Sequence, residues 1–134
     1  MDENKIRLSF SKQGLMKTFG AKLISVEDGK VIIECSLNEG LTQQHGFFHA
    51  GVLTGIVDSA CGYAAFTLMP EGKEVLSVEF KINFLKPANT PKIIAIGNVL
   101  QSGKNLTVCE GSVYDATHTK LIAKMQATMI AVDV

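Results

Sequence analysis

One carboxylate lies within an otherwise apolar segment of the sequence. Asp58 falls in the run from Ala50 to Met69, where apolar residues recur at intervals of three and four, as in a buried helix. An ionised carboxylate is costly to bury without partners, so Asp58 either hydrogen-bonds a neighbouring loop or has a function. Its reference pKa of about 3.9 favours the ionised form at neutral pH, which can act as a general base or a nucleophile.

The residues that lead into this helix offer complementary chemistry. The first amides of a helix have no intrahelical acceptor and lie at the positive end of its dipole. The backbone N–H groups of Ala50 and Gly51 can therefore donate to a carbonyl oxygen that becomes anionic during attack. Their small side chains leave room for a ligand to approach.

Small residues share a face of the predicted helix with the carboxylate. At about 100° per residue, a stripe roughly 60° wide contains Gly51, Gly55, Asp58 and Gly62. Each glycine inside a helix costs about 1 kcal/mol relative to alanine, so the stripe needs an explanation. Either it allows another backbone to pack closely, such as that of a partner subunit, or it also forms the floor of a substrate cleft.

The remaining elements are predicted from periodicity and turn residues. A short amphipathic helix is expected from Ser9 to Phe19, followed by a hairpin of strands at residues 21–26 and 30–37 around Asp28-Gly29. After a turn at residues 70–72, residues 76–84 alternate between apolar and polar, which predicts a strand with one apolar face. Three further strands are predicted at residues 92–100, 106–114 and 120–132.

This order of elements predicts an α+β fold. We expect an antiparallel sheet of five to six strands wrapped around one long central helix, with a short N-terminal helix against it. The length of 134 residues fits a single domain spanning residues 1–134.

Composition gives no bulk electrostatic reason to expect several classes of partner, although a local basic patch is compatible with it. The 13 basic and 13 acidic side chains give a formal net charge of zero, so bulk charge favours neither nucleic acid nor an anionic membrane. The polar N-terminus lacks the apolar core of a signal peptide, and we expect a cytoplasmic protein. The three cysteines, Cys35, Cys61 and Cys109, have no CxxC spacing and are predicted to be reduced core residues.

The segment from His49 to Ser59 resembles the HGG-x6-D segment of the PaaI-like hotdog-fold acyl-CoA thioesterases. The segment from Ser77 to Ala88 resembles that family's next strand. The resemblance covers residues 43–88 as motifs and the rest of the chain as strand order. It implies a hotdog fold and hydrolysis of an acyl-CoA or aryl-CoA thioester to the free acid and CoA.

The resemblance also implies catalytic residues. The acid of the family's helix, a general base or nucleophile, corresponds to Asp58, and the amide that polarises the thioester carbonyl corresponds to Ala50. Gln43 corresponds to an amide side chain that contacts the water or the carbonyl, and Ser77 to a hydroxyl that helps to hold the water.

Substrate contacts are expected from the loop that precedes the helix. His49 and Gly51 are expected to contact the substrate. Phe47 and Phe48 either line an acyl pocket as well or staple the start of the helix to the sheet. His49 is expected to orient the loop through a hydrogen bond rather than to donate protons. His45, His49 and His118 lack any metal-ligand spacing, and we expect neither a metal nor another cofactor.

In the resembling family the site lies between two subunits. Gln43 and Ala50 would then face Asp58 and Ser77 of the partner subunit. We therefore expect a homodimer or homotetramer with an acyl-CoA substrate and with no nucleic-acid or membrane partner.

Two other functions compete with hydrolysis. Hotdog dehydratases need a histidine base and a helix acid five residues after the glycine of a GVL motif. Gly51 and Asp58 are seven residues apart, which turns the carboxylate about 160° around the helix from the position of the dehydratase acid.

A non-catalytic acyl-CoA-binding protein is the alternative from another class, suggested by Ala50, which stands where the family has glycine. Cys61 is expected to be a core residue rather than a nucleophile.

Overall fold

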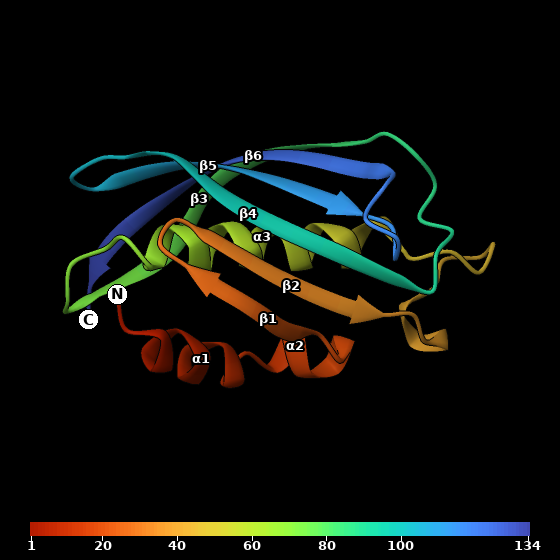
Figure 1. The fold of residues 1–134 in the computed structure, drawn as a ribbon, viewed down its shortest axis with the longest axis horizontal. Helices are drawn as coiled ribbons and strands as arrows, with labels where there is room; N and C mark the ends of the chain where they lie inside the picture. The colour runs from red at the N-terminus through yellow and green to blue at the C-terminus, as the bar shows by residue number, and fades with distance from the viewer.

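Six antiparallel strands form one curved sheet around a single long helix in the computed structural model, which describes residues 1–134 (Figure 1). The strand order is β1-β2-β4-β5-β6-β3. This arrangement confirms the predicted α+β fold, with α3 inside the curve of the sheet and two short helices beside β1. The elements are α1 (Glu3–Ser11), α2 (Gly14–Phe19), β1 (Lys22–Glu27), β2 (Lys30–Ser36), a 3-10 turn (Glu39–Leu41), α3 (Ala50–Phe66), β3 (Lys73–Phe84), β4 (Lys92–Ser102), β5 (Leu106–Tyr114) and β6 (Leu121–Asp133).

The N-terminal helix expected from Ser9 to Phe19 is present, but a break at residues 12–13 divides that range between the end of α1 and all of α2. The cap of the first helix is Asp2, whose carboxylate accepts hydrogen bonds from the backbone N–H groups of Asn4 and Lys5. The second helix starts after Gln13, which has an extended backbone conformation. The side chain of Gln13 bonds to α3, and these tertiary hydrogen bonds accompany the break between α1 and α2.

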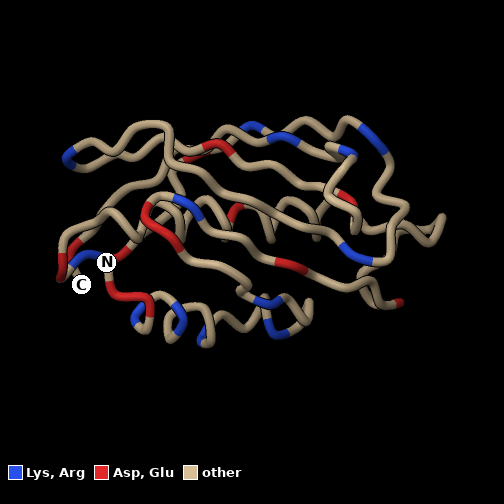
Figure 2. Tube along the Cα trace, in the orientation of Figure 1, with Lys and Arg blue, Asp and Glu red and all other residues tan.

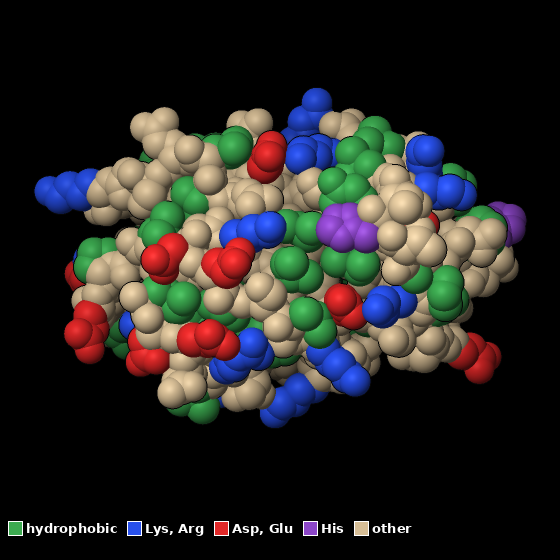
Figure 3. All heavy atoms as spheres, viewed as in Figure 1, with side chains coloured by type: hydrophobic (Ala, Val, Ile, Leu, Met, Phe, Trp, Pro, Cys, Tyr) green, Lys and Arg blue, Asp and Glu red, His purple; other side chains and the backbone are tan.

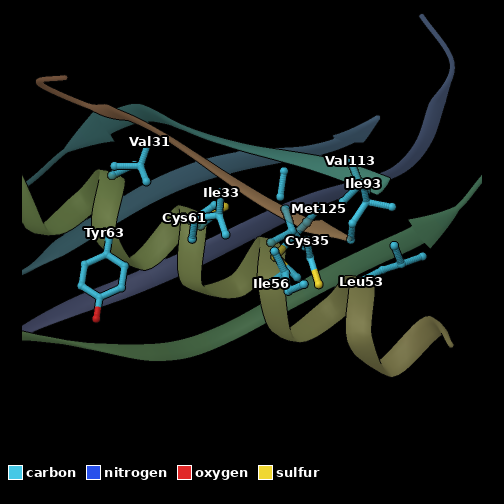
Figure 4. Close-up of a cluster of buried hydrophobic side chains, with 14 of the residues drawn as sticks. Val31, Ile33, Cys35, Leu53, Ile56, Cys61, Tyr63, Ile93, Val113 and Met125 are labelled. Carbon is cyan, nitrogen blue, oxygen red and sulfur yellow. The ribbon is translucent and has the colours of Figure 1, made fainter. Parts of the chain in front are cut away.

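The hydrophobic core lies between α3 and the concave face of the sheet. Figure 4 shows side chains from β2, β4, β5 and β6 converging on one side of the helix. The three cysteines are buried and free, as predicted. Fully buried members of this core include Val31, Ile33, Cys35, Ile56, Cys61, Ile93, Val113 and Met125.

Two glycines allow α3 to approach the sheet closely. A Cβ atom at Gly97 of β4 would overlap the backbone of Ala60 and Cys61. A Cβ atom at Gly111 of β5 would overlap the Val57 side chain. The helix backbone therefore lies directly against β4, at a distance that no other residue type permits.

One edge of the sheet exposes apolar side chains. β3 pairs only with β6, so its other edge has no partner strand in the chain. Natural proteins rarely leave a long, apolar edge strand uncovered. The exposed apolar side chains on and just after this strand are Leu76, Val78, Phe80, Phe84 and Leu85.

Charged side chains are spread over the molecule. Basic and acidic residues are interspersed over the trace (Figure 2), and the face in Figure 3 mixes both signs with small apolar areas. None of the helices combines the length and the hydrophobicity that a membrane span requires.

We predict that Gly97→Ala lowers the unfolding midpoint in urea, because the added methyl group forces α3 away from β4. Overpacking of a core typically costs about 1–3 kcal/mol, and here the atom that must shift is helix backbone. Gly14→Ala is the matched control, since nothing lies within 4 Å of a Cβ atom there and the position is helical. That control should leave stability unchanged or raise it. Equal midpoints for Gly97→Ala and the wild type would contradict the close-packing argument.

Candidate active site

The structure brings two of the expected site residues together. The Ser77 hydroxyl donates a hydrogen bond to Oδ1 of Asp58 across 2.7 Å. Asp58 is half-buried on α3, and Ser77 lies on β3. The same hydroxyl lies 3.3 Å from the sulfur of buried Met129. This bond fixes one carboxylate oxygen and leaves Oδ2 free to act on a ligand or a water molecule.

An irregularity in β3 turns Ser77 toward Asp58. Ser77 pairs with Met129 and Glu79 pairs with Thr128, so the extra residue Val78 forms a bulge. A bulge reverses the alternation of side chains along a strand. Without it, Ser77 would lie on the face opposite to the one that it now occupies.

The predicted single apolar face over residues 76–84 is therefore wrong. Directly opposed residues share a face of a sheet. Phe80 lies opposite buried Ala127, and Ser77 lies opposite buried Met129, so both face inward. Leu76, one residue before Ser77, faces outward and is exposed.

Burial dominates the electrostatics of the carboxylate. Desolvation raises the pKa of Asp58 above its ordinary value, and the hydrogen bond from Ser77 partly opposes this shift. The charged form is thus less stable here than in water, which increases its readiness to accept a proton.

The start of α3 offers one free backbone donor. Nδ1 of His49 accepts a hydrogen bond from the Gly51 N–H across 2.8 Å, so His49 orients the loop as expected and a neutral ring carries its proton on Nε2. The Gly51 donor is thereby occupied, which corrects the expectation that it could bind a carbonyl oxygen. The Ala50 N–H has no acceptor within the chain. Ala50 is exposed, so this donor is accessible.

Gln43 shapes the same loop. Its Oε1 accepts from the backbone N–H groups of His45, at 2.6 Å, and Phe47, at 3.2 Å. The side-chain oxygen is thus occupied, and the Nε2 amide remains available as a donor.

Phe48 is buried in the main core and staples the loop to the sheet, whereas Phe47 is half-buried at the cleft wall. This cleft is lined by Gln43, Phe47, Phe48, His49, Ala50, Leu53, Phe84, Lys86, Pro87 and Ala88.

Within one chain, the two halves of the expected site lie apart. Asp58 and Ser77 line a separate cavity that shares no residue with the cleft at Ala50. Ala50 and Asp58 are eight residues apart on α3, which separates them by about 12 Å along the helix axis. A single carbonyl group cannot contact both.

The cavity beside Asp58 includes residues that sequence reasoning missed. Gln13, Ser59 and Tyr63 line it and form a hydrogen-bonded group. Ser59 and Tyr63 could have been noticed as polar side chains on an apolar helix. Gln13 carries no local signal, because it lies 46 residues before Ser59 in the sequence.

The structure also explains the glycine stripe. A Cβ atom at Gly55 would lie 3.2 Å from the Phe19 ring, so α2 of the same chain packs on this position. A Cβ atom at Gly62 would meet nothing closer than the Met129 sulfur at 4.0 Å. The stripe is therefore packed against α2 at Gly55, whereas Gly62 is buried but has room beside it for a Cβ atom.

Cys61 takes no part in this site. It is fully buried in the core, and burial raises the pKa of its thiol. A thiol is a poor nucleophile in such surroundings. The prediction that Cys61 is a core residue is confirmed.

We predict that Asp58→Asn raises the thermal unfolding midpoint at pH 7. Since the pKa of Asp58 is raised in the folded state, the native protein binds more protons than the unfolded chain between the two pKa values. The unfolding free energy of the wild type therefore falls as pH rises through that window. The gain from the substitution should shrink when the pH drops toward the ordinary range of a carboxyl group. A variant less stable than the wild type at pH 7 would show that the ionised carboxylate is well solvated.

Comparisons with known proteins place the chain in a family. The model of the thioesterase superfamily matches residues 45–122. A thioesterase family protein from Silicibacter pomeroyi has a TM-score of 0.95 and 42% identity, over 98% of both chains. Human acyl-coenzyme A thioesterase 13 is 31% identical over 107 residues, which are 79% of this chain and 76% of the relative. The E. coli PaaI protein, at 20% identity, shares the fold with a TM-score of 0.85 over 94% of this chain and 89% of its own. The expected resemblance is confirmed: the chain is an enzyme of the thioesterase superfamily.

Proposed function

We propose that the protein hydrolyses an acyl-CoA or aryl-CoA thioester to the free acid and CoA, with Asp58 as general base or nucleophile. The observation that carries this proposal is the Ser77–Asp58 hydrogen bond of 2.7 Å, which orients a half-buried carboxylate beside a cavity. Similarity to a named acyl-coenzyme A thioesterase supports the class of substrate.

The groups of the site suffice for thioester hydrolysis. As general base, Oδ2 of Asp58 takes a proton from a water molecule while the water oxygen attacks the carbonyl carbon. The Ala50 N–H and Nε2 of Gln43 stabilise the resulting oxyanion. Collapse of the intermediate breaks the C–S bond and releases the CoA thiolate, which takes up a proton. As nucleophile, the same carboxylate oxygen attacks the carbonyl carbon, and the C–S bond breaks to release the CoA thiolate and leave a mixed anhydride. Water then hydrolyses the anhydride to the free acid and restores the carboxylate.

The site is completed by a second copy of the chain in this proposal. Asp58 and the Ala50 amide lie about 12 Å apart along one helix, whereas a base and an oxyanion donor must act on the same carbonyl. The unpaired apolar edge of β3 offers a surface for a symmetric contact between two copies. Gln43 and Ala50 then face Asp58 and Ser77 of the partner subunit, in a homodimer or a homotetramer.

The cleft at Ala50 continues toward a basic area that suits CoA. Phe47, Lys86 and Pro87 also line a larger cavity of about 520 Å³, which includes Lys120. The two lysines offer positive charge to the phosphates of CoA. The third charged residue of this cavity, Asp115, accepts hydrogen bonds from its own turn, and these lower its pKa to about 2.

The free buried cysteines fit a reducing compartment such as the cytoplasm.

We predict that the wild type releases free thiol from a panel of acyl-CoA thioesters and that Asp58→Asn does so at least about 100-fold more slowly. The substitution keeps the size of the side chain and its acceptor for the Ser77 hydroxyl, so the fold should persist. Thiol release is followed with a thiol-reactive dye, and folding by circular dichroism. Binding without thiol release by either protein would favour a non-catalytic acyl-CoA-binding protein. Equal release by both would show that Asp58 is not the catalytic group.

We predict that two inactive variants restore activity when they are mixed. Ala50→Pro removes the proposed N–H donor at the first position of α3, where proline is well tolerated. His49, with φ of −66° and ψ of 140°, already has the conformation that precedes proline. Unfolding and refolding an equal mixture of Ala50→Pro and Asp58→Asn should give about a quarter of the wild-type activity, because half of the dimers are mixed and each has one intact site.

A site formed within one chain would give no recovery in this mixture. Each variant refolded alone is the control for residual activity. Ala50→Ser, which keeps the N–H group, should remain active by itself and shows whether the amide or the side chain matters.

A further inference from the structure

A buried methionine lies beneath the hydrogen bond of the candidate site. Met129 is on β6, directly opposite Ser77 of β3, and its side chain is fully buried. Its sulfur lies 3.3 Å from Oγ of Ser77. The same sulfur is 4.0 Å from the position of a Cβ atom at Gly62. The thioether therefore lies between α3 and β3, close to the point where Asp58 and Ser77 meet.

The sheet itself does little to fix the Ser77 side chain. β3 is an edge strand whose only partner in the chain is β6, and the bulge at Val78 directly follows Ser77. A bulge disrupts the regular ladder locally. The Ser77 side chain is exposed, and a side chain of this kind has three staggered rotamers to choose from. The groups that hold its hydroxyl are therefore the Asp58 carboxylate and the Met129 sulfur.

The Ser77 hydroxyl has one hydrogen to donate and two acceptors within reach. A carboxylate is the stronger acceptor, because its charge assists the hydrogen bond, whereas a thioether sulfur is a weak acceptor. While Asp58 is ionised, the hydrogen therefore points to Oδ1 across 2.7 Å. The sulfur then makes only a close contact with the hydroxyl oxygen.

The proposed reaction removes the charge of Asp58 by either route. As general base the carboxylate gains a proton, and as nucleophile it becomes one half of an anhydride. The Ser77 hydroxyl then loses its charge-assisted acceptor, at a stage when bound substrate also displaces water from the site. The Met129 sulfur can take the hydrogen after a rotation about the Cβ–Oγ bond alone, so the Ser77 rotamer need not change.

We propose that Met129 is a positioning residue for the hydrolysis, and that its sulfur is the second acceptor of the Ser77 hydroxyl while Asp58 is neutral. This inference rests on the proposed thioester hydrolysis. The hydroxyl stays paired through the whole cycle, which lowers the free energy of the neutral carboxyl group relative to a site without the sulfur. Asp58 accepts a proton more readily for this reason.

A conservative exchange tests the role of the sulfur. Met129→Leu removes the acceptor and nearly keeps the volume, and exchanges of this kind are tolerated best in a core. We predict that it lowers kcat for acyl-CoA hydrolysis about three- to tenfold, as expected for one hydrogen bond, and leaves KM within about twofold. Circular dichroism checks that the variant is folded.

Met125→Leu is the matched control. Met125, labelled in Figure 4, is buried on the same face of β6 and lies opposite Ile82 rather than Ser77. It should keep the wild-type kcat. Equal kcat values for Met129→Leu and Met125→Leu would overturn the inference.

A double-mutant cycle shows whether Met129 acts through Ser77. In the Ser77→Ala background there is no hydroxyl from which the sulfur can accept, so Met129→Leu should leave the remaining kcat unchanged. An equal loss in both backgrounds would mean that Met129 acts through packing alone, and it would overturn the inference.

The pKa of Asp58 provides a readout without turnover. Loss of the second acceptor destabilises the neutral carboxyl group, so Met129→Leu should lower this pKa. Ser77→Ala should raise it, because the hydrogen bond that lowers the pKa is lost. Carbon NMR of labelled aspartate measures both shifts, and Asp58→Asn identifies the resonance. Glu74 and Tyr63, the other titratable groups along the Asp58 cavity, are unchanged in these variants.

The two readouts separate this inference from the proposed function. If the wild type hydrolyses no acyl-CoA thioester but Met129→Leu lowers the pKa of Asp58, thioester hydrolysis fails and the second acceptor stands. If thioesters are hydrolysed and Met129→Leu matches Met125→Leu in kcat and in the pKa of Asp58, only the role of Met129 is lost. A pKa raised by Met129→Leu would also overturn that role, because it would indicate a change in burial.

Discussion

The close contact between α3 and β4 constrains most of the structure. Gly97 removes the side chain that would separate the two backbones, and Gly111 does the same beside Val57 on β5. With the helix held at this distance, its rotation about its own axis is fixed. One face must then point away from β4 and β5, toward β3 and the N-terminal helices. Asp58, Gly55 and Gly62 lie on that face, so a core-packing constraint places the carboxylate where a ligand can reach it.

The second constraint is the bulge in β3. The strand has to place the side chain of Ile82 toward the core, and it also has to present a hydroxyl to Asp58. Strict alternation cannot do both, because Ser77 and Ile82 are an odd number of residues apart. The extra residue, Val78, resolves the conflict within the strand. Bulges commonly adjust a side chain beside an active site in this way.

The sequence predicts the framework well because its signals are local. The helix after His49, the hairpin at Asp28-Gly29 and the later strands follow from periodicity and turn residues that lie next to one another. The pairing of Asp58 with Ser77 was predicted only through resemblance to a family. What the sequence could not reveal depends on distant contacts. The break at Gln13 goes with bonds to Tyr63 and Ser59, about fifty and forty-six residues away, and no local pattern records them.

The bulge and the occupied Gly51 donor escaped prediction for related reasons. An alternating apolar pattern gives no hint of an inserted residue, since Leu76, Val78 and Phe80 read as a regular strand face. In the sequence alone the amides of Ala50 and Gly51 are equivalent, and only the position of the His49 ring distinguishes them. That ring satisfies one orphan amide of the helix and leaves the other free.

The two amides at the start of α3 differ, because the Gly51 N–H group binds the His49 ring and the Ala50 N–H group stays free. This difference explains why alanine is suitable at position 50. A ligand at the start of α3 needs the N–H group, which alanine supplies as well as glycine does. The Ala50 side chain is exposed, so its methyl group displaces no neighbour, and alanine is the stronger helix former by about 1 kcal/mol. Replacing glycine here therefore stabilises the first turn and preserves the donor. The departure from the family motif thus concerns the stability of the helix end, and the proposed chemistry requires only the backbone N–H group at this position.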